Sequence, residues 1–285
     1  MKLRLTSAIA LGAILCALAF AKRNPGDPPG IIGQWSSHAA DLAARGFENA
    51  SLFLNTTTIL RRDRLASIEM MSEYPIEHPL RRRGASIGML LIEMEAPDGS
   101  RSSFSCTAAL LRRALVITNQ HCLKKGGSIA VELMLWLDHT DKDDGTFLTL
   151  DPKPLETDAA LDFALLHLRE ARAPTALSDL DGIAVRAAIP GERLFIIHHA
   201  KGKAQQISRA FCRAFIEQLR SNEISHSCPT HPGSSGALVF AESDGAIVGL
   251  HHSATTKPDT VRGYATTLTV IVAKSQVLAP RTAAR

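Results

Sequence analysis

Short apolar runs separated by turn residues dominate the chain from Gly84 onward. Each run is long enough for one strand, and glycine, proline and aspartate stand between the runs, a pattern typical of an antiparallel barrel or sandwich. Helix-like periodicity is confined to residues 209–220 and 270–278. The pattern therefore predicts an all-β domain over residues 84–285 that ends in a helix. The runs predicted to form strands are residues 87–94, 105–111, 114–118, 129–137, 163–168, 194–198, 236–240, 246–250 and 263–269.

The first residues show a different pattern, that of a secretory signal peptide. Lys2 and Arg4 precede an apolar run over residues 5–20, and small alanines at positions 19 and 21 form a cleavage site. The run is short for a hydrocarbon core of roughly 30 Å, so a membrane anchor is the weaker alternative. We therefore predict a signal peptide over residues 1–21, a secreted or periplasmic protein, and no membrane association after cleavage.

Residues 22–83 form a separate region between this segment and the strand-rich part. A turn-rich stretch at residues 24–30 opens the region, and basic clusters follow at residues 61–64 and 81–83. The region is either a propeptide with basic processing sites or an N-terminal extension with a charged, solvated face. Both interpretations stay open, and the mature N-terminus is expected anywhere from the first residue of this region to Gly84.

Composition narrows the expected partners and the redox compartment. The 32 basic and 28 acidic residues are interspersed, and no aromatic-interleaved basic stripe accompanies the net charge of +4, so nucleic acid is not an expected partner. Loss of the signal peptide would remove Cys16 and leave an even number of cysteines, which in an exported chain indicates disulfides. Three pairings are possible, and the sequence-local pairs Cys106–Cys122 and Cys212–Cys228 are favoured. The close Cys-x-x-Cys pairs of zinc sites are missing from the sequence.

Three residues in chain order bring the groups that acyl transfer requires, namely His121, Asp162 and Ser235. Serine is a weak nucleophile until a general base takes its proton, and imidazole titrates near neutral pH. A carboxylate that hydrogen-bonds the second ring nitrogen holds the base in the required tautomer. Asp158 competes for this role, but Asp162 directly precedes the apolar run 163–168 and is preferred. Each residue alone would suggest a packed histidine, a turn aspartate or a loop serine, whereas their combination predicts a catalytic triad.

The surrounding motifs resemble those of the chymotrypsin-like serine proteases of trypsin fold, and most of all the bacterial secreted branch that includes the glutamyl endopeptidases. The resemblance covers about residues 84–270. It implies two antiparallel six-stranded β-barrels, over about residues 84–170 and 185–285, with a C-terminal helix. The motifs that carry it are Cys106, His121-Cys122, Asp162-Phe163-Ala164-Leu165-Leu166 and Gly233-Ser234-Ser235-Gly236.

The same resemblance implies a secreted serine endopeptidase that acts on proteins or peptides, works as a monomer and needs no cofactor. It also implies that the N–H groups of Gly233 and Ser235 bind the oxyanion. Ser234 departs from the pattern, because many animal members carry an aspartate there that pairs with a newly cut N-terminal ammonium. Serine cannot form this ion pair, so any activation of this chain must work differently. A non-catalytic binding protein with the protease fold is the rival interpretation.

Substrate preference is indicated less directly. Pro229 occupies the position where an aspartate would select lysine or arginine, so a trypsin-like preference is not expected. Thr230 and His251 stand at about the places where glutamyl endopeptidases bind the substrate carboxylate, and a hydroxyl and an imidazole N–H suit a Glu or Asp side chain. Because His252 is adjacent to His251, either histidine could face the pocket. A small or apolar pocket is the alternative.

Histidine doublets at 198–199 and 251–252 raise the question of a metal site. Adjacent residues of a strand point to opposite faces of a sheet, so neither doublet can easily chelate one ion. We therefore expect no metal ligand among them.

Overall fold

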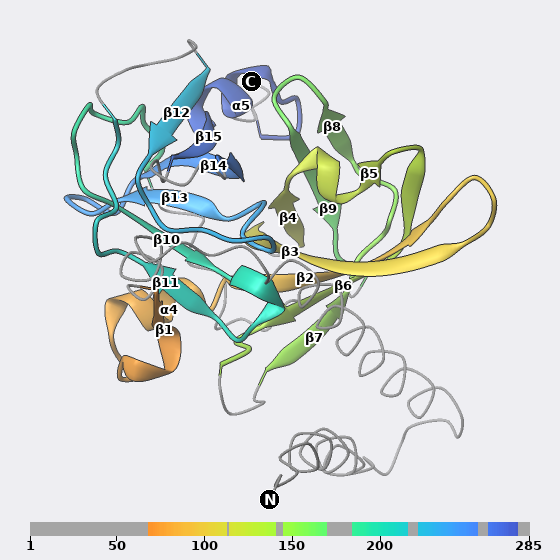
Figure 1. Ribbon diagram of the computed structural model, residues 1–285, viewed down its shortest axis with the longest axis horizontal. Helices are drawn as coiled ribbons and strands as arrows, with labels where there is room; N and C mark the ends of the chain where they lie inside the picture. Colours follow the sequence, from red (N-terminus) through yellow and green to blue (C-terminus); the bar gives the residue numbers. More distant parts are fainter. Residues whose placement is uncertain are drawn as a thin grey trace, which may run out of the picture.

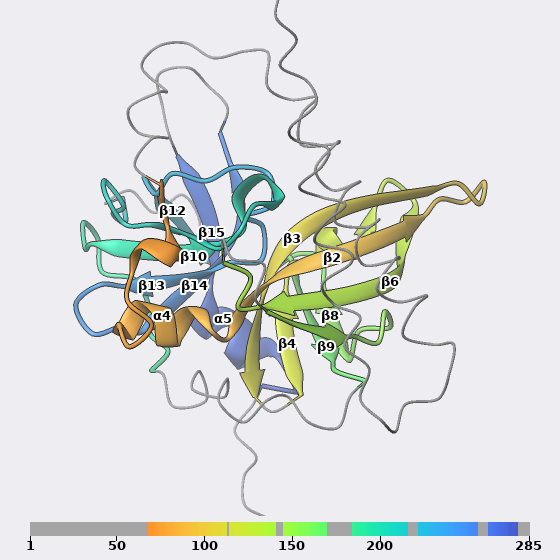
Figure 2. The same cartoon turned by 90° about the horizontal axis from the view of Figure 1, so that it is seen from below.

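A computed structural model describes residues 68–112, 114–140, 145–169, 184–215, 222–255 and 262–278. The predicted signal peptide at 1–21 and residues 22–67 of the predicted N-terminal region lie outside the described residues. Two lobes of β-strands, one from each half of the described chain, stand side by side (Figures 1 and 2). Among the described residues, no helix is long and apolar enough to cross a membrane.

The first lobe is an antiparallel barrel. Its ring runs through β6, β2, β3, β4 and β9, and β7 pairs with the other edge of β6. Leu150, directly after β7, bridges Leu168, directly after β9, and this bridge closes a ring of six strands. The strands are β2 (Ile87–Glu95), β3 (Arg101–Arg112), β4 (Leu115–Thr118), β5 (Lys124–Lys125), β6 (Ser128–Leu137), β7 (Thr146–Thr149), β8 (Glu156–Asp158) and β9 (Phe163–His167).

The second lobe closes in a similar way. Neighbouring strands run in the order β11, β10, β13, β14, β15 and β12. After β11 the chain reaches Arg213, which bridges Arg193 just before β10, and then Ala214, which bridges His226 at the end of β12. The extension of β11 therefore links β10 to β12 and closes a ring of six strands. The strands are β10 (Leu194–His198), β11 (Gln206–Ser208), β12 (Glu223–His226), β13 (Leu238–Ala241), β14 (Ile247–Ala254) and β15 (Gly263–Thr267).

The barrel strands are buried on both faces, which explains their nearly continuous apolar runs. In β9, Phe163 and Leu165 pack into a cluster shared by the two lobes, whereas Ala164 and Leu166 face the interior of the first barrel. Phe195 and Phe240 join the shared cluster from the second lobe. The predicted two-barrel, all-β fold is therefore confirmed, and the two barrels pack together through this shared core.

Each predicted strand run contains a strand, and the predicted C-terminal helix is α5 (Leu268–Lys274). The strands that were not predicted have only two to four residues each, too few to form a recognisable apolar run. The helix predicted over 209–220 is wrong for residues 209–215, which form no helix. Leu194 donates its backbone N–H to the carbonyl of Cys212, and the disulfide to Cys228 holds the same residue, so the backbone is drawn into the barrel wall. Residues 216–220 lie outside the described part.

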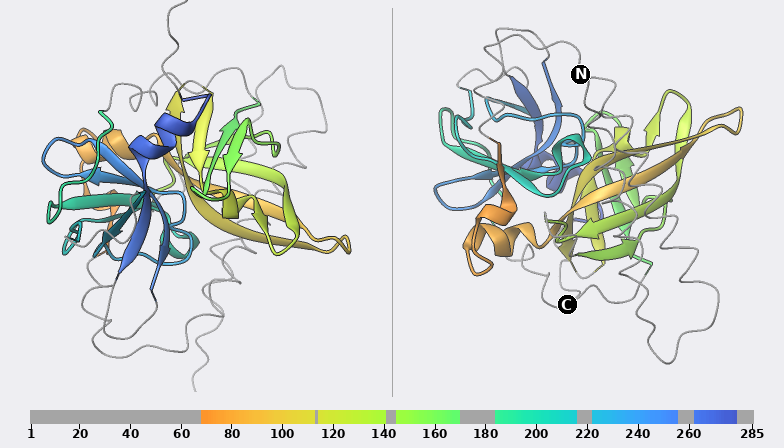
Figure 3. Two further views of the ribbon diagram at one scale, coloured as in Figure 1. Left: turned by 90° about the horizontal axis from the view of Figure 1, so that it is seen from above. Right: turned by 60° about the horizontal axis from the view of Figure 1, so that its bottom comes forward.

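The N-terminal described segment is built into the second lobe. It consists of β1 (Ile68–Met70), a 3₁₀ turn at Met71–Glu73 and α4 (Pro79–Gly84). Strand β1 pairs with β11 and adds a strand to the sheet beyond the six-stranded ring. Figure 3 shows this segment, in orange, lying beside the teal strands of the second lobe.

Candidate active site

His121 lies at the end of the first barrel, in a short 3₁₀ turn (Gln120–Cys122) that follows β4. Strand β4 pairs with β9 so that Thr118 lies opposite Ala164. The residues that follow β4 and those that precede β9 are therefore neighbours. Asn119 secures this junction by donating its side-chain N–H to the carbonyl of Asp162 at 2.8 Å.

His121 contacts the Asp162 carboxylate at two points, one through its ring and one through its backbone. Nδ1 of His121 lies 2.7 Å from Oδ2 of Asp162, and the backbone N–H of His121 donates to Oδ1 at 2.9 Å. Asp162 has φ +49°, a left-handed turn that directs its carboxylate back toward His121. Because Nδ1–H donates to the carboxylate, Nε2 of the neutral ring is left as a proton acceptor.

Asp158, the competing carboxylate, has a structural role. Its Oδ1 accepts the backbone N–H groups of Ala160 and Leu161, and its Oδ2 lies 2.5 Å from Nζ of Lys274. It therefore shapes the turn before β9 and ties the C-terminal helix to the first barrel.

A disulfide between Cys106 and Cys122 fixes the His121 turn to β3, with an S–S length of 2.00 Å and Cα atoms 6.4 Å apart. Potential ligand atoms of Cys106, His121 and Cys122 lie within 4.8 Å of one another. Both sulfur atoms are consumed by the disulfide, so this cluster offers no thiolate to a metal ion.

Ser235 lies in a tight turn over residues 233–236, the serine turn, whose geometry requires its two glycines. Gly233 has φ +97° and Gly236 has φ +86°. A Cβ on Gly233 would lie 2.5 Å from the carbonyl oxygen of His199, and one on Gly236 would lie 2.1 Å from that of Thr107. Glycine alone satisfies both the positive φ and the lack of space.

Thr107 of the first barrel holds this turn of the second barrel in place. Its backbone N–H donates to the carbonyl of Ser235 at 2.8 Å, and its hydroxyl donates to the carbonyl of Gly233 at 2.8 Å. Thr107 directly follows Cys106, which is bonded to the neighbour of His121. The middle of β3 therefore anchors both the turn that contains His121 and the turn that contains Ser235.

Some polar groups of the serine turn have no hydrogen-bond partner among the described residues. Ser235 Oγ donates to the carbonyl of His252 at 3.4 Å, and no described hydrogen bond joins it to His121. Hydrogen bonds of this kind are often long in ligand-free sites. Neither Gly233 nor Ser235 donates its backbone N–H to any described residue, whereas the N–H of Ser234 donates to the carbonyl of His231 at 3.0 Å.

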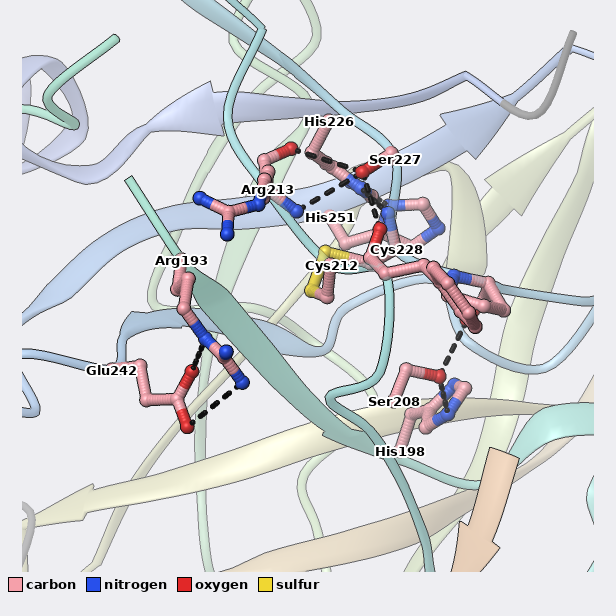
Figure 4. Close-up of a disulfide and its surroundings, with 12 residues drawn as sticks. Arg193, His198, Ser208, Cys212, Arg213, His226, Ser227, Cys228, Glu242 and His251 are labelled. Carbon is pink, nitrogen blue, oxygen red and sulfur yellow. Dashed lines mark hydrogen bonds and ion pairs between the residues drawn. A yellow bond between two sulfur atoms is a disulfide. The ribbon is translucent and has the colours of Figure 1, made fainter. Parts of the chain in front are cut away.

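The second disulfide, Cys212–Cys228, borders a buried polar region beside the serine turn (Figure 4). The backbone N–H of Cys228 donates to Nδ1 of His226 at 3.2 Å, so the proton of the neutral His226 ring is on Nε2. This Nε2–H donates to Nδ1 of His251 at 3.1 Å. His251 must then carry its own proton on Nε2, and no described residue accepts that proton.

Both histidines are buried and neutral. Burial, and to a smaller extent His252, lowers the pKa of His226 to about 3. Burial and the neighbouring His226 hold the pKa of His251 well below its ordinary value, with smaller effects from other histidines that include His121. The region therefore presents an N–H donor without a positive charge.

The structure distinguishes between the adjacent histidines on β14. His251 is buried next to the serine turn, and its carbonyl accepts the N–H of Gly236 at 2.8 Å. His252 is half-buried and faces Glu223, with Nε2 3.6 Å from Oε1. Thr230 is half-buried two residues after Cys228, and no described hydrogen bond joins it to His251.

Sequence reasoning missed Thr107, which could have been suspected only from its place after Cys106. It acts through contacts between segments that are far apart in the chain.

Comparisons with known proteins agree with this arrangement. A family model for the trypsin-like peptidase domain matches residues 106–250, more than half of the chain. The serine endoprotease from Yersinia pestis is similar in structure, with a TM-score of 0.51, 14% identity, and coverage of 68% of this chain and 62% of that chain. The active form of the Rv3671c protease from M. tuberculosis has a TM-score of 0.51, 15% identity, and coverage of 70% and 85%. This chain therefore matches under two thirds of the Yersinia protein, and a search of curated proteins finds no match.

Proposed function

The chain belongs to the family of trypsin-like peptidase domains, and we propose that it is a serine endopeptidase that cleaves peptide bonds through an acyl-enzyme. The observation that carries this proposal is the contact between His121 Nδ1 and Asp162 Oδ2 at 2.7 Å, made beside a serine turn with two uncommitted N–H groups. A binding protein that has lost catalysis would have no need to keep this arrangement.

Each residue has a defined role in the proposed reaction. Ser235 Oγ attacks the substrate carbonyl carbon while His121 Nε2 takes its proton. Asp162 holds the tautomer of His121 and stabilises the imidazolium that forms. The N–H groups of Gly233 and Ser235 donate to the oxyanion, and His121 then gives its proton to the leaving amine. In the second half, His121 takes a proton from a water molecule whose oxygen attacks the acyl carbon, and it returns that proton to Ser235 Oγ as the carboxylic acid product leaves.

The reaction is tested with a fluorophosphonate probe, which reacts only with an activated serine. We expect the probe to label the folded protein on Ser235 and a peptide-hydrolysing activity to disappear with it. Ser235→Ala should abolish both, whereas Ser243→Ala, at an exposed turn serine, should leave both unchanged. A folded, processed protein that neither reacts nor cleaves would establish the binding-protein interpretation instead.

We further propose a preference for Glu or Asp before the scissile bond. The support is the series of hydrogen bonds that runs from the N–H of Cys228 through His226 to His251. This series leaves the Nε2–H of His251 to donate to an incoming group. A substrate carboxylate can accept this hydrogen bond. Its negative charge also favours protonation of His251, and the resulting ion pair offsets the cost of burying the carboxylate. Pro229 at the proposed pocket base is buried and has no charge to attract lysine or arginine.

Peptides that carry Glu, Ala, Phe or Arg before the scissile bond test this preference. We expect the highest kcat/KM for Glu, and His251→Leu should lower that value about 10- to 100-fold while leaving cleavage after Ala nearly unchanged, because one hydrogen bond to a charged group is lost. Faster cleavage after Ala or Phe by the unaltered protein would favour the small or apolar pocket.

Export is proposed on separate grounds. Two disulfides, Cys106–Cys122 and Cys212–Cys228, suit an oxidising compartment, and residues 1–21 have the pattern of a signal peptide. N-terminal sequencing of the protein recovered outside the cytoplasm should give a start between Lys22 and Ile68. Recovery of the intact N-terminus from the cytoplasm would contradict this proposal.

A further inference from the structure

A buried hydrogen-bonded chain runs beneath the serine turn, centred on His198 of β10. Its Nδ1 lies 2.6 Å from Oγ of Ser234, and its Nε2 lies 3.1 Å from Oγ of Ser208. Ser208 Oγ in turn donates to the carbonyl of Pro229 at 2.6 Å. His198, Ser208 and Ser234 are all inaccessible to solvent. Figure 4 shows Ser208 between the His198 ring and the segment that follows Cys228.

The positions of the protons in this chain follow from its hydrogen bonds. Ser208 has one hydroxyl proton, and the carbonyl of Pro229 takes it. Nε2 of His198 must therefore carry a proton and donate it to Ser208, which leaves Nδ1 of the neutral ring as an acceptor. Ser234 donates its hydroxyl proton to Nδ1, and its oxygen accepts the N–H of His231 at 3.2 Å. Each hydroxyl has two partners and each nitrogen of the His198 ring has one, and a single arrangement of protons satisfies them all.

The chain depends on a neutral His198 ring. Burial, together with smaller effects of the nearby His199, His231 and His226, lowers the pKa of His198 to about 3. A protonated ring would bring a second donor to Ser234, whose own proton would then have no acceptor. Near neutral pH the hydrogen bonds from Ser234 through His198 to Ser208 therefore all persist.

Ser234 is the residue between the two N–H groups that the proposed mechanism assigns to the oxyanion. We propose that His198 and Ser208 are positioning residues that hold Ser234, and through it the N–H groups of Gly233 and Ser235, in the orientation that stabilises the transition state. This inference rests on the proposed function. Gly233 adopts other backbone conformations at little cost, so the turn needs an anchor that its own backbone does not supply.

The anchor differs in kind from an ion pair. An aspartate at position 234 would need a buried cation, whereas Ser234 is held by neutral groups from β10, β11 and the segment after Cys228. Its strength is therefore independent of a new N-terminal ammonium and is little screened by salt. The second barrel itself supplies this anchor, which adds to the hydrogen bonds that Thr107 of the first barrel makes to the turn.

Three variants test this role by steady-state kinetics. Ser234→Ala and His198→Leu remove the anchor, and we expect kcat to fall about 10- to 100-fold with KM nearly unchanged, because only the transition state needs the aligned N–H groups. His198→Asn keeps an acceptor near the position of Nδ1 and should retain kcat within about 3-fold. Affinity for a peptide boronate, which forms a tetrahedral adduct, should fall in step with kcat, and affinity for a product peptide should not.

His199→Asn is the matched control, because His199 is equally buried and its ring does not contact the serine turn. It should lose stability without losing kcat. Normal kcat in folded Ser234→Ala, or an equal loss in His199→Asn, would overturn the inference. If the unaltered protein neither cleaves nor reacts with fluorophosphonate, the proposed function fails separately. In that case, amide hydrogen exchange of residues 231–236 still decides the role of the anchor, since it should accelerate in Ser234→Ala and not in His199→Asn.

Discussion

At the scale of single residues, the two carboxylates near β9 have separate tasks. Asp162 uses both oxygens on His121, and Asp158 uses its oxygens on a turn and on Lys274. Asp158 ends β8 and Asp162 lies in the turn that follows, so the direction of the backbone separates their roles. The left-handed φ of Asp162 turns its carboxylate toward the histidine.

Asp162→Asn should lower kcat about 10⁴-fold at neutral pH, because an amide cannot accept hydrogen bonds at both positions and the histidine loses its required tautomer. Asparagine tolerates the left-handed conformation, so the fold should be kept. The measurement is kcat on a peptide substrate, with circular dichroism to follow folding. Asp158→Asn is the control, and a comparable loss of kcat in that variant would show that the carboxylate roles are assigned wrongly.

At the scale of elements, the segment from Ile68 to Gly84 is part of the second lobe. Met71 is fully buried in the core shared by the two lobes, and β1 lies along β11 with Ile68 opposite Ser208. The Arg83 guanidinium lies 5.0 Å from the centre of the Phe240 ring and donates to the carbonyl of Gly245. A protease that cut the chain at residues 81–83 would separate these contacts from the rest of the barrel, which supports a processing site upstream of Ile68.

Arg83→Ala should lower the free energy of unfolding by about 2 kcal/mol, since it removes a half-buried cation–π contact and leaves the Gly245 carbonyl without its donor. Arg82→Ala, at the exposed neighbouring position, should change it by less than about 0.5 kcal/mol. Urea denaturation of both variants gives the comparison. Equal effects at the two positions would mean that the basic cluster is only a solvated surface.

At the scale of the whole molecule, buried neutral histidines make stability depend on pH. The pKa values of His198, His199 and His226 are all lowered to about 3, chiefly by burial. In the unfolded chain the same rings titrate near 6.5. The unfolded state therefore binds protons that the folded state does not, and the associated stability is complete above pH 6.5 and is lost progressively as pH falls toward 3.

Unfolding in urea at pH 7, 6 and 5 should show this loss, because most carboxylates titrate below this range. Each buried histidine contributes a slope of up to about 1.4 kcal/mol per pH unit once its unfolded form is protonated. His199→Asn should reduce the total slope by about one such contribution. An unchanged slope would show that His199 is accessible to protons in the folded protein.

Local properties explain what could be predicted from the sequence. Run length and turn residues placed the strands, and the two sequence-local cysteine pairs are the ones joined in the structure. The mistaken helix at 209–215 shows the limit of the method, because its local periodicity is overridden by a disulfide and by pairing with distant strands.

The sequence by itself determined the order of the longer strands along the chain and the chain order of His121, Asp162 and Ser235, and it favoured the disulfide pairs that the structure contains. Only the tertiary structure decided that Asp162 rather than Asp158 faces His121, that His251 rather than His252 is buried, and that His198 lies beneath Ser234. The physical reason is the same in each case. These contacts depend on the register between segments far apart in the chain, and no local pattern of residues carries that information.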